Sequence, residues 1–218
     1  INVSRNEKIS NNLVKKTTNE QSRLLSQIKK EKVNTQIVYG KKEFLDEMAK
    51  LPRIDLSKKV EDGLISTKKG EKPVPGAYLS KKEIDDHLKL FEGGVVKVIS
   101  KESFDKALLK YGGTIGPEDG QFVMPKFIYE KAVRASNGNP RVLEELLGLD
   151  KDFLGKNPIV IEPIKLDYLK FPSGNEKGAY EGLWGPGGYT KGGIPEAIIN
   201  QLHKGDYIDR NVYKGVLK

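Results

Sequence analysis

A glycine-rich segment near the C-terminal end sets the first constraint on the fold. Residues 172–198 hold eight of the chain's 23 glycines and its only tryptophan, Trp184. Glycine loses more conformational entropy on folding than any other residue, so this segment is costly to order. Long loops in compact domains usually bind something or stay disordered, and an aromatic residue inside the segment favours order. We expect either a ligand-holding loop or a surface Ω-loop plugged by Trp184.

The centre of this segment has the residue types of a ligand-binding loop. Two glycine pairs allow backbone amides to approach a ligand closely. A helix beginning at Pro195 would turn its N-terminus toward an anion. Trp184 and Tyr189 can sandwich a flat ring. The candidate ligand-binding residues are Asn175, Trp184, Gly187, Gly188, Tyr189, Thr190, Gly192 and Gly193.

Three residues are candidates for catalysis, and each also has a purely structural interpretation. Glu196, at the start of the expected final helix, would stabilise a cationic transition state such as an oxocarbenium ion, or simply complement the helix dipole. Glu176, with Asn175, would hydrogen-bond a ribose or an amide, or only form a turn. His87, on an expected helix over 81–91, is a general base, a ligand contact or an ordinary helix-surface histidine.

Several classes of protein are excluded by what the chain lacks. It has no cysteine and only two histidines, so disulfides, zinc–thiolate sites and cysteine nucleophiles are excluded and no metal is expected. It has no G-x-G-x-x-G or P-loop fingerprint and no G-x-S-x-G elbow. No run of 18 apolar residues is present, so we expect no membrane span.

The net charge of +8 is distributed unevenly and indicates two parts. Residues 1–75 carry 17 Lys and Arg against 10 Asp and Glu, whereas residues 76–218 carry 21 against 20. The stretch 66–76, with Pro73 and Pro75, has the composition of a linker. We therefore predict a basic, mainly helical lead-in for delivery or docking over 1–75 and a compact domain over 76–218.

Periodicity and turn residues predict an α+β fold. Helices and strands follow one another without regular βαβ spacing, and no internal repeat is present. Asn139, Pro140 and Gly148 show the expected order of N-cap, first helical residue and terminating glycine. The expected helices cover 1–33 (or a disordered lead-in there), 41–51, 81–91, 102–111, 126–135, 140–147 and 195–205. The expected strands cover 35–40, 95–99, 121–125 and 158–164.

An ordered set of short motifs resembles a known class of bacterial protein. "GAYLS" (76–80) precedes His87, and "GQFVMP" (120–125), "PSGNE" (172–176) and "WGPGGYTKGGIPEA" (184–197) follow. Over residues 75–212 this arrangement resembles the C-terminal effector modules of bacterial polymorphic toxins of the Rhs, contact-dependent-inhibition and LXG kinds.

The resemblance implies a secreted or surface-delivered toxin that acts in the cytoplasm of a target cell during interbacterial competition. A cognate immunity protein would neutralise it in the producing cell. Such modules form the tails of longer polypeptides, and a chain that begins at Ile1 instead of Met fits this expectation.

The strand followed by a late Pro-Gly-Gly loop also resembles the tuberculosis necrotising toxin type, which cleaves NAD within an ADP-ribosyltransferase-like fold. Here Trp184 and Gly185 occupy the place where that type carries glutamine, and no Glu-x-Glu is present. The resemblance implies an NAD-consuming enzyme, either a glycohydrolase or an ADP-ribosyltransferase, with NAD as substrate. The alternatives are a nuclease acting on the tRNA, rRNA or DNA of the target cell and a non-enzymatic protein-binding module. The near-neutral charge of 76–218 favours NAD over nucleic acid.

Overall fold

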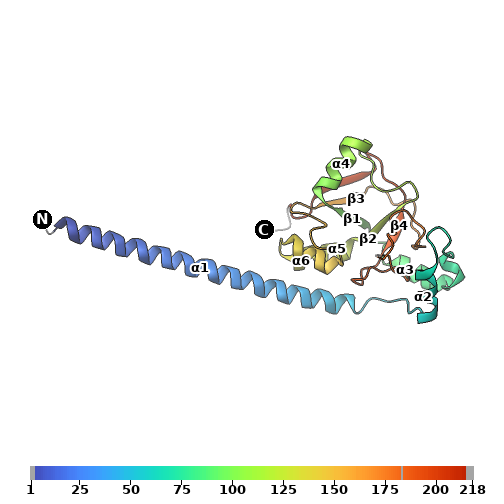
Figure 1. Ribbon diagram of the computed structural model, residues 1–218, viewed down its shortest axis with the longest axis horizontal. Coiled ribbons are helices and arrows are strands. Elements are labelled where there is room, and N and C mark those ends of the chain that lie inside the picture. Colours follow the sequence, from blue (N-terminus) through green and yellow to red (C-terminus); the bar gives the residue numbers. More distant parts are fainter. Residues whose placement is uncertain (1–2, 183, 215–218) are drawn as a thin grey trace.

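The computed structural model describes the backbone of residues 3–182 and 184–214. The elements mix helices and strands without regular alternation, so the fold is α+β, as predicted (Figure 1). In chain order they are α1 (Val3–Met48), α2 (Lys58–Ser66), η1 (Pro75–Ala77), α3 (Lys81–Lys89), β1 (Val95–Ile99), α4 (Lys101–Tyr111), β2 (Gln121–Pro125), α5 (Lys126–Ser136), α6 (Pro140–Leu147), β3 (Ile159–Pro163), β4 (Ala197–Ile199) and β5 (Tyr207–Asn211).

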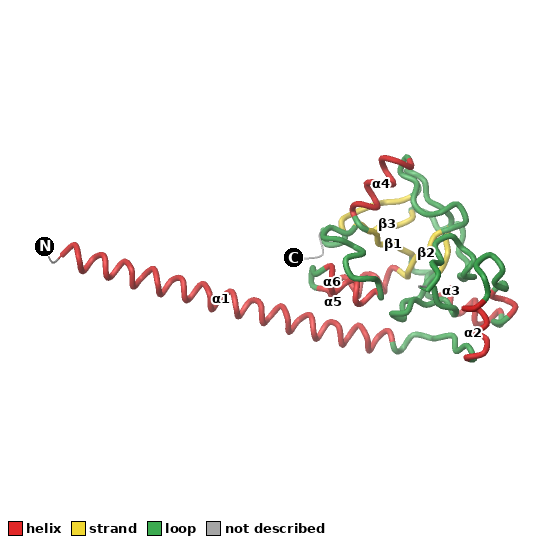
Figure 2. Tube along the Cα trace, in the orientation of Figure 1, coloured by secondary structure: helices red, strands yellow, loops and turns green. Residues whose placement is uncertain are grey.

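A five-stranded sheet in the order β4-β2-β1-β3-β5 forms the centre of the domain (Figure 2). Every neighbouring pair of strands is antiparallel. β2 lies between β4 and β1. Its Phe122 stands opposite Ile198 of β4, and its Met124 stands opposite Val96 of β1. The last residues before β4 therefore lie at one edge of the sheet, two strands away from β1.

Both faces are covered at the centre of the sheet, where β1, β3 and β4 carry apolar runs, whereas β5 at the edge is polar and partly exposed. On one face Val96 and Val160 pack with α5, α6 and the C-terminal end of α1. On the other face Ile161 and Ala197 pack with Phe104 of α4 and with Phe91, just after α3. The long helix α1 contributes to this core only through its last turns and projects away from the domain beyond them (Figure 1).

Capping chemistry fixes the helix ends where the sequence placed them. Ser80 and Glu83 form a reciprocal capping box at the start of α3. Asn139 accepts hydrogen bonds from the first amides of α6, and Gly148 ends that helix in the left-handed conformation at φ 67°. Gly112 ends α4 in the same way. These helices and the strands at 95–99, 121–125 and 159–163 confirm the local predictions.

The predicted strand over 35–40 is wrong, because these residues continue α1 without a break from Val3 to Met48. Ile37 packs against the same core as Phe44 and Met48. That spacing is helical, and it outweighs the short β-branched run. The lead-in is thus helical over its described part, whereas residues 1–2 lie outside it.

The predicted helix over 195–205 is also wrong. Residues 197–199 form β4 instead, and the chain then turns and enters β5, which the sequence analysis missed. A short apolar run that is buried on all sides does not distinguish a strand from a helix by periodicity. Glu196 therefore leads into a strand and does not stand at the N-terminus of a helix. His203 lies in a turn, where its amide donates to Asp206 Oδ2 at 2.9 Å.

The stretch expected to act as a linker lies against the domain. Residues 52–72, here called the strap, include α2 and run beside the glycine-rich segment. Asn175 Oδ1 accepts hydrogen bonds from the amides of Gly70 (2.8 Å) and Lys72 (3.1 Å). The prolines and glycines of this stretch therefore belong to a segment that is hydrogen-bonded to the domain, not to a flexible linker. The division into 1–75 and 76–218 stays a prediction.

Candidate functional site

The glycine-rich loop folds into a compact turn that leads directly into β4. Tyr189 and Pro195 form an isolated antiparallel bridge. Inside it, the amide of Thr190 donates to the carbonyl of Ile194 at 2.9 Å, and the Thr190 hydroxyl oxygen accepts from the Ile194 amide at 3.1 Å. Gly193 adopts φ 79°, which a residue with a side chain rarely takes. The loop is therefore ordered by its own backbone.

Two of the loop glycines permit close approach to the rest of the chain. A Cβ at Gly192 would lie 2.6 Å from Gly148 Cα, at the end of α6. A Cβ at Gly188 would lie 2.8 Å from both His87 Cε1 and Phe171 Cζ. Packing against the protein itself thus accounts for these two glycines, in addition to the ligand role predicted for them.

The strap covers the outer side of the loop. The Tyr189 hydroxyl donates to the carbonyl of Pro52, and the Arg53 guanidinium lies 5.8 Å from the centre of the Tyr189 ring. Lys69 Nζ donates to the carbonyls of Lys177 and Ala179, each at 2.9 Å. The predicted ring-stacking residue Tyr189 is therefore held between the strap and the domain.

Asn175 and Glu176 form the turn that receives the strap. Asn175 Nδ2 donates to the Lys72 carbonyl at 2.9 Å, which adds to the two bonds accepted by Oδ1. Glu176 is buried, and its carboxylate accepts from the amides of Ser173 (3.1 Å) and Gly174 (2.9 Å). The structure thus shows the turn-forming role for both residues, and a catalytic role of Glu176 stays a prediction.

Trp184 lies on the same turn. A Cβ at Gly174 would be 2.6 Å from Trp184 Cζ2, so the indole ring rests on the glycine backbone. Lys72 Nζ lies 5.1 Å from the centre of the ring, within the range of a cation–π contact. Trp184 thus contacts both the strap, through Lys72, and the turn at Gly174, which agrees with the plug interpretation. Its stacking with the ring of a ligand stays a prediction.

His87 lies inside the domain, not on its surface. Its side chain is 3% exposed, and the centre of its ring lies 4.8 Å from the centre of the Phe171 ring and 5.2 Å from that of Tyr189. Nε2 lies 2.8 Å from the carbonyl oxygen of Glu196, which requires a proton on Nε2. Burial lowers the pKa of His87, so the ring is neutral at pH 7. Among the described residues, Nδ1 has no hydrogen-bond partner.

Glu196 has the most perturbed carboxyl group at the site. Its amide donates to the Gly188 carbonyl at 2.8 Å, and its carbonyl accepts from His87. The loop and α3 thus fix the backbone of Glu196 from two sides. Burial raises the pKa of the side chain to about 7, and the positive charge of Lys97 opposes part of that shift. A carboxyl group with this pKa exchanges a proton at neutral pH.

Lys97 is a site residue that the sequence analysis missed. It stands in the middle of β1, and its Nζ donates to the Phe122 carbonyl on β2 at 3.2 Å. Burial lowers the pKa of Lys97, and the negative charge of Glu196 opposes part of that shift. The signal was present as a single lysine inside the apolar run Val95–Ile99, since a cation in a buried strand requires a partner.

The structure therefore brings together most of the residues chosen from sequence. His87, Gly188, Tyr189 and Glu196 meet around the entry to β4. Asn175, Glu176 and Trp184 gather on the neighbouring turn under the strap.

Comparisons with known proteins leave the site to be interpreted from its own chemistry. The chain matches no protein-family model, and no curated protein matches it significantly. Over the part of the chain that the structure describes, no group of three or more His, Cys, Asp or Glu side chains is arranged to hold a metal ion. Within the same residues, no helix combines the length and apolar character needed to cross a membrane.

Proposed function

We propose that this chain is an effector-toxin module that consumes NAD, as a glycohydrolase or an ADP-ribosyltransferase, with Glu196 as its catalytic carboxylate. The observation that carries the proposal is the Glu196 carboxyl group, partly buried at the exit of the glycine loop near Lys97, where desolvation raises its pKa to about 7. Perturbed carboxyl groups fixed by a loop are typical of catalytic sites. The motif resemblance to polymorphic toxins supports the biological setting.

The chemistry follows from the charges on NAD. The bond between the ribose C1′ and the nicotinamide nitrogen breaks, and the bonding electrons leave with neutral nicotinamide. Positive charge then develops on the ribose as an oxocarbenium ion. The ionised Glu196 stabilises that charge and accepts a proton from the attacking water or acceptor group. The products with water are ADP-ribose, nicotinamide and one proton.

The other candidate residues have assigned places in this scheme. His87 holds the Glu196 backbone through its Nε2–H bond and acts as a positioning residue. Trp184 and Tyr189 contact the nicotinamide ring, and the backbone amides of Gly187, Gly188 and Gly192 approach the pyrophosphate. In the producing cell a cognate immunity protein blocks the site. The module is delivered from outside and acts in the cytoplasm of a target cell.

The test measures by chromatography the nicotinamide that the purified full chain releases from NAD. We expect Glu196→Gln to lower turnover about 10²–10³-fold, the usual scale for removing one electrostatic group. Glu181→Gln is the matched control, because Glu181 is exposed in the same segment. If the wild-type chain and the Glu196→Gln and Glu181→Gln variants are equally active, Glu196 is not the catalytic carboxylate.

A second assay separates NAD consumption from nuclease activity. The chain is expressed in bacteria under tight induction, and NAD and total RNA are measured in the same arrested cells. We expect depleted NAD with intact RNA. Intact NAD with fragmented tRNA or rRNA would reject the NAD proposal in favour of a nuclease, and His87→Ala would then be the next variant. Normal growth with soluble, folded protein would reject the toxin proposal.

A further inference from the structure

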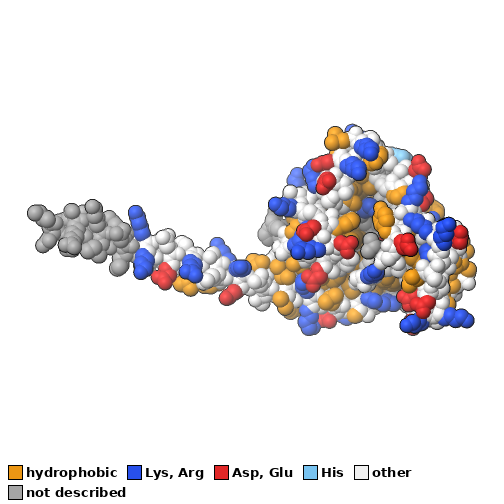
Figure 3. All heavy atoms as spheres, in the orientation of Figure 1, with side chains coloured by type: hydrophobic (Ala, Val, Ile, Leu, Met, Phe, Trp, Pro, Cys, Tyr) orange, Lys and Arg blue, Asp and Glu red, His pale blue; other side chains and the backbone are white. Residues whose placement is uncertain are grey.

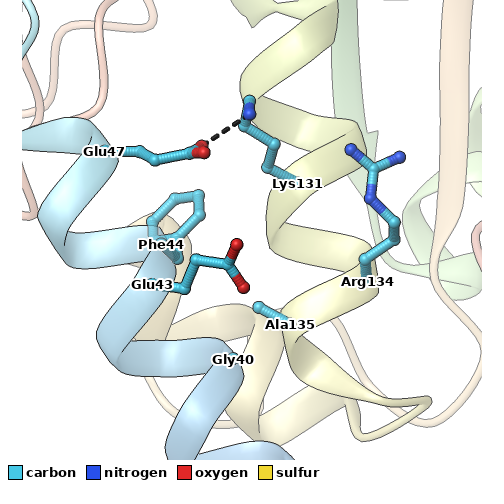
Figure 4. A pocket seen from close by; sticks show the side chains of 7 residues that line it. All are labelled: Gly40, Glu43, Phe44, Glu47, Lys131, Arg134 and Ala135. Atoms are coloured by element: carbon cyan, nitrogen blue, oxygen red, sulfur yellow. Dashed lines mark ion pairs between the residues drawn. The ribbon is translucent and has the colours of Figure 1, made fainter.

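The charged cleft between α1 and α5 is satisfied within the chain. It has a volume of about 220 Å³, and Glu47 and Lys131 bridge it in an ion pair of 2.5 Å (Figure 4). A Cβ at Gly40 would lie 3.1 Å from Ala135 Cα, so the two helices also pack closely beside it. The cleft thus joins two packed helices, and its bridging charges neutralise each other.

The connection from β3 to the edge of β4 has the opposite character. Residues 165–169 contain no turn, bend or helix, and none of their main-chain N–H and C=O groups has a hydrogen-bond partner among the described residues. All five side chains from Ile164 to Tyr168 are exposed. An exposed, extended chain with unpaired main-chain groups is a template for another strand.

The sheet keeps this connection extended. The chain leaves β3 at Pro163 and next meets the sheet at Lys170, which exchanges main-chain hydrogen bonds of 2.9 and 3.0 Å with Ile198 on the outer side of β4. In the strand order β4-β2-β1-β3-β5 it passes β1, β2 and β4, which is four strand spacings or about 19 Å along the sheet. Seven residues span at most about 25 Å, so little slack remains.

The exposed side chains of this connection alternate between apolar and charged. Ile164, Leu166 and Tyr168 are 63%, 39% and 43% exposed. Lys165 and Asp167 stand between them and form an ion pair of 2.8 Å. Because successive side chains of an extended chain point to opposite sides, one side of residues 164–168 is apolar and the other is charged.

The pattern of residues 164–168 is complementary to itself. In an antiparallel pair with Leu166 opposite Leu166, Ile164 stands opposite Tyr168 and Lys165 opposite Asp167. Apolar side chains then meet apolar ones and each lysine meets an aspartate, and both kinds of pair stabilise a sheet. A pair centred on Lys165 or on Asp167 would oppose like charges. A shift by one residue would set charged side chains against apolar ones.

The charge of the domain allows two copies to approach each other. Residues 76–218 carry 21 Lys and Arg against 20 Asp and Glu. Figure 3 shows side chains of both signs interspersed over the face of the domain that it draws. A surface of mixed sign and almost no net charge creates little repulsion between identical domains.

We infer that residues 164–168 form an antiparallel ladder with the same residues of a second copy of this chain, with Leu166 on the twofold axis. A ladder of five residues is smaller than the interface of a permanent dimer, so the association is reversible. It requires neither NAD nor Glu196 and is independent of the proposed activity.

The test uses the full chain, which has no cysteine, so one introduced thiol is its only thiol. Directly opposed residues of an antiparallel pair have Cβ atoms about 4.5–5.5 Å apart, close to the separation in a disulfide. Under mild oxidation Leu166→Cys should form a covalent dimer at least about tenfold faster than Leu109→Cys, the control at an α4 leucine that is 88% exposed. Non-reducing electrophoresis of timed samples measures both rates.

Two further variants test the register of the ladder. Ile164→Cys and Tyr168→Cys should each dimerise slowly alone, because the two copies of either position lie four residues, or about 13 Å, apart along the ladder. Mixed in equal amounts, with one chain carrying a size tag, they should form the mixed dimer rapidly.

Charge exchange tests the pairing of Lys165 with Asp167. In the Leu166→Cys chain, Asp167→Lys places lysine opposite lysine and should slow cross-linking about tenfold at low salt. Adding Lys165→Asp brings opposite charges together again and should restore the rate, in chains whose circular dichroism matches the wild type. A double exchange that stays as slow as Asp167→Lys would contradict this pairing.

Three further outcomes would overturn the inference. The first is equal cross-linking of Leu166→Cys and Leu109→Cys, as expected for random collision. The second is cross-linking of Ile164→Cys or Tyr168→Cys alone as fast as in the mixture, since no fixed register would then exist. The third is binding of an alternating valine–threonine peptide, in fluorescence anisotropy, by a Leu166→Cys chain that does not cross-link to itself. That result would assign residues 164–168 to a strand of another protein.

Discussion

At the scale of single residues, glycine has two separable roles in this chain. Gly148 and Gly155 both adopt left-handed backbone conformations, at φ 67° and 64°. A Cβ at Gly148 would lie 2.7 Å from Gly192 Cα, whereas a Cβ at Gly155 would meet nothing within 4 Å. At Gly155 the backbone conformation alone requires glycine. At Gly148 the conformation and the close contact with Gly192 of the loop both require it.

This difference predicts unequal effects of alanine. Gly155→Ala should lower the free energy of unfolding by about 1 kcal/mol, the cost of a left-handed alanine. Gly148→Ala should cost about 3 kcal/mol or more, because the backbone of the loop must also move away. Urea denaturation of both variants measures the difference. Equal losses would mean that α6 and the loop separate freely.

The partly buried carboxyl group of Glu196 predicts a pH-dependent stability. Its pKa is about 7 in the folded chain against an ordinary value of 4.5, so the folded state holds the proton more tightly. The stabilisation is complete below pH 4.5 and is lost as the pH rises through about 7. A shift of this size corresponds to about 3 kcal/mol as an upper value. Glu196→Gln should therefore raise the unfolding free energy at pH 8.

The Glu196→Gln variant also reveals the pH dependence of stability that comes from His87. The pKa of His87 is lowered, so its contribution has the opposite sign: it is present above pH 6.5 and is lost as the pH falls through the folded pKa. In Glu196→Gln, denaturation midpoints should stay flat from pH 8 to 7 and fall below about pH 6.5. A midpoint in the variant that still falls from pH 5 to 8 would show that Glu196 is not the group responsible.

At the scale of elements, the local sequence predicts helices well and short strands poorly. Caps such as Ser80 and Asn139 act within four residues, so the sequence alone locates them. β4 has only three residues, and both of its sides are covered, so nothing in its own pattern distinguishes it from a helix. Its identity comes from hydrogen bonds to β2, more than 70 residues earlier in the chain.

The strap gives an element-scale prediction. Asn175→Ala removes three hydrogen bonds that hold Gly70 and Lys72 against the loop. Losing about 1.4 kcal/mol of net bonding should speed proteolytic cleavage within 66–76 about tenfold, because local opening exposes the chain. Mass spectrometry of timed digests measures the rate. Asn157→Ala, at an exposed asparagine, is the control and should cleave like the wild type.

At the scale of the whole molecule, the candidate site is an assembly of distant segments. Sequence analysis named the loop residues, His87 and Glu196, because their residue types stand out locally. It missed the strap residues Arg53 and Lys69, since their places depend on contacts across more than 100 residues. It also missed Lys97, whose partners Phe122 and Glu196 lie on other segments of the chain. It also placed Glu196 on a helix instead of before β4. The residue types of the candidate site could be picked out from the sequence, and their geometry could not.

The same interdependence predicts where the folding unit begins. Residues 14–36 of α1 are exposed, so deleting residues 1–36 should change the thermal unfolding midpoint by less than about 2 °C, the effect of a few tenths of a kcal/mol. A chain of 76–218 also loses Phe44 and Met48 from the core and the whole strap from the loop. Each large core side chain contributes about 2–5 kcal/mol, and total stability is about 5–15 kcal/mol. Residues 37–218 should therefore melt cooperatively, whereas 76–218 should show no cooperative transition in circular dichroism. A sharp transition in 76–218 at the wild-type midpoint would instead make that segment the complete domain and the strap a dispensable cover.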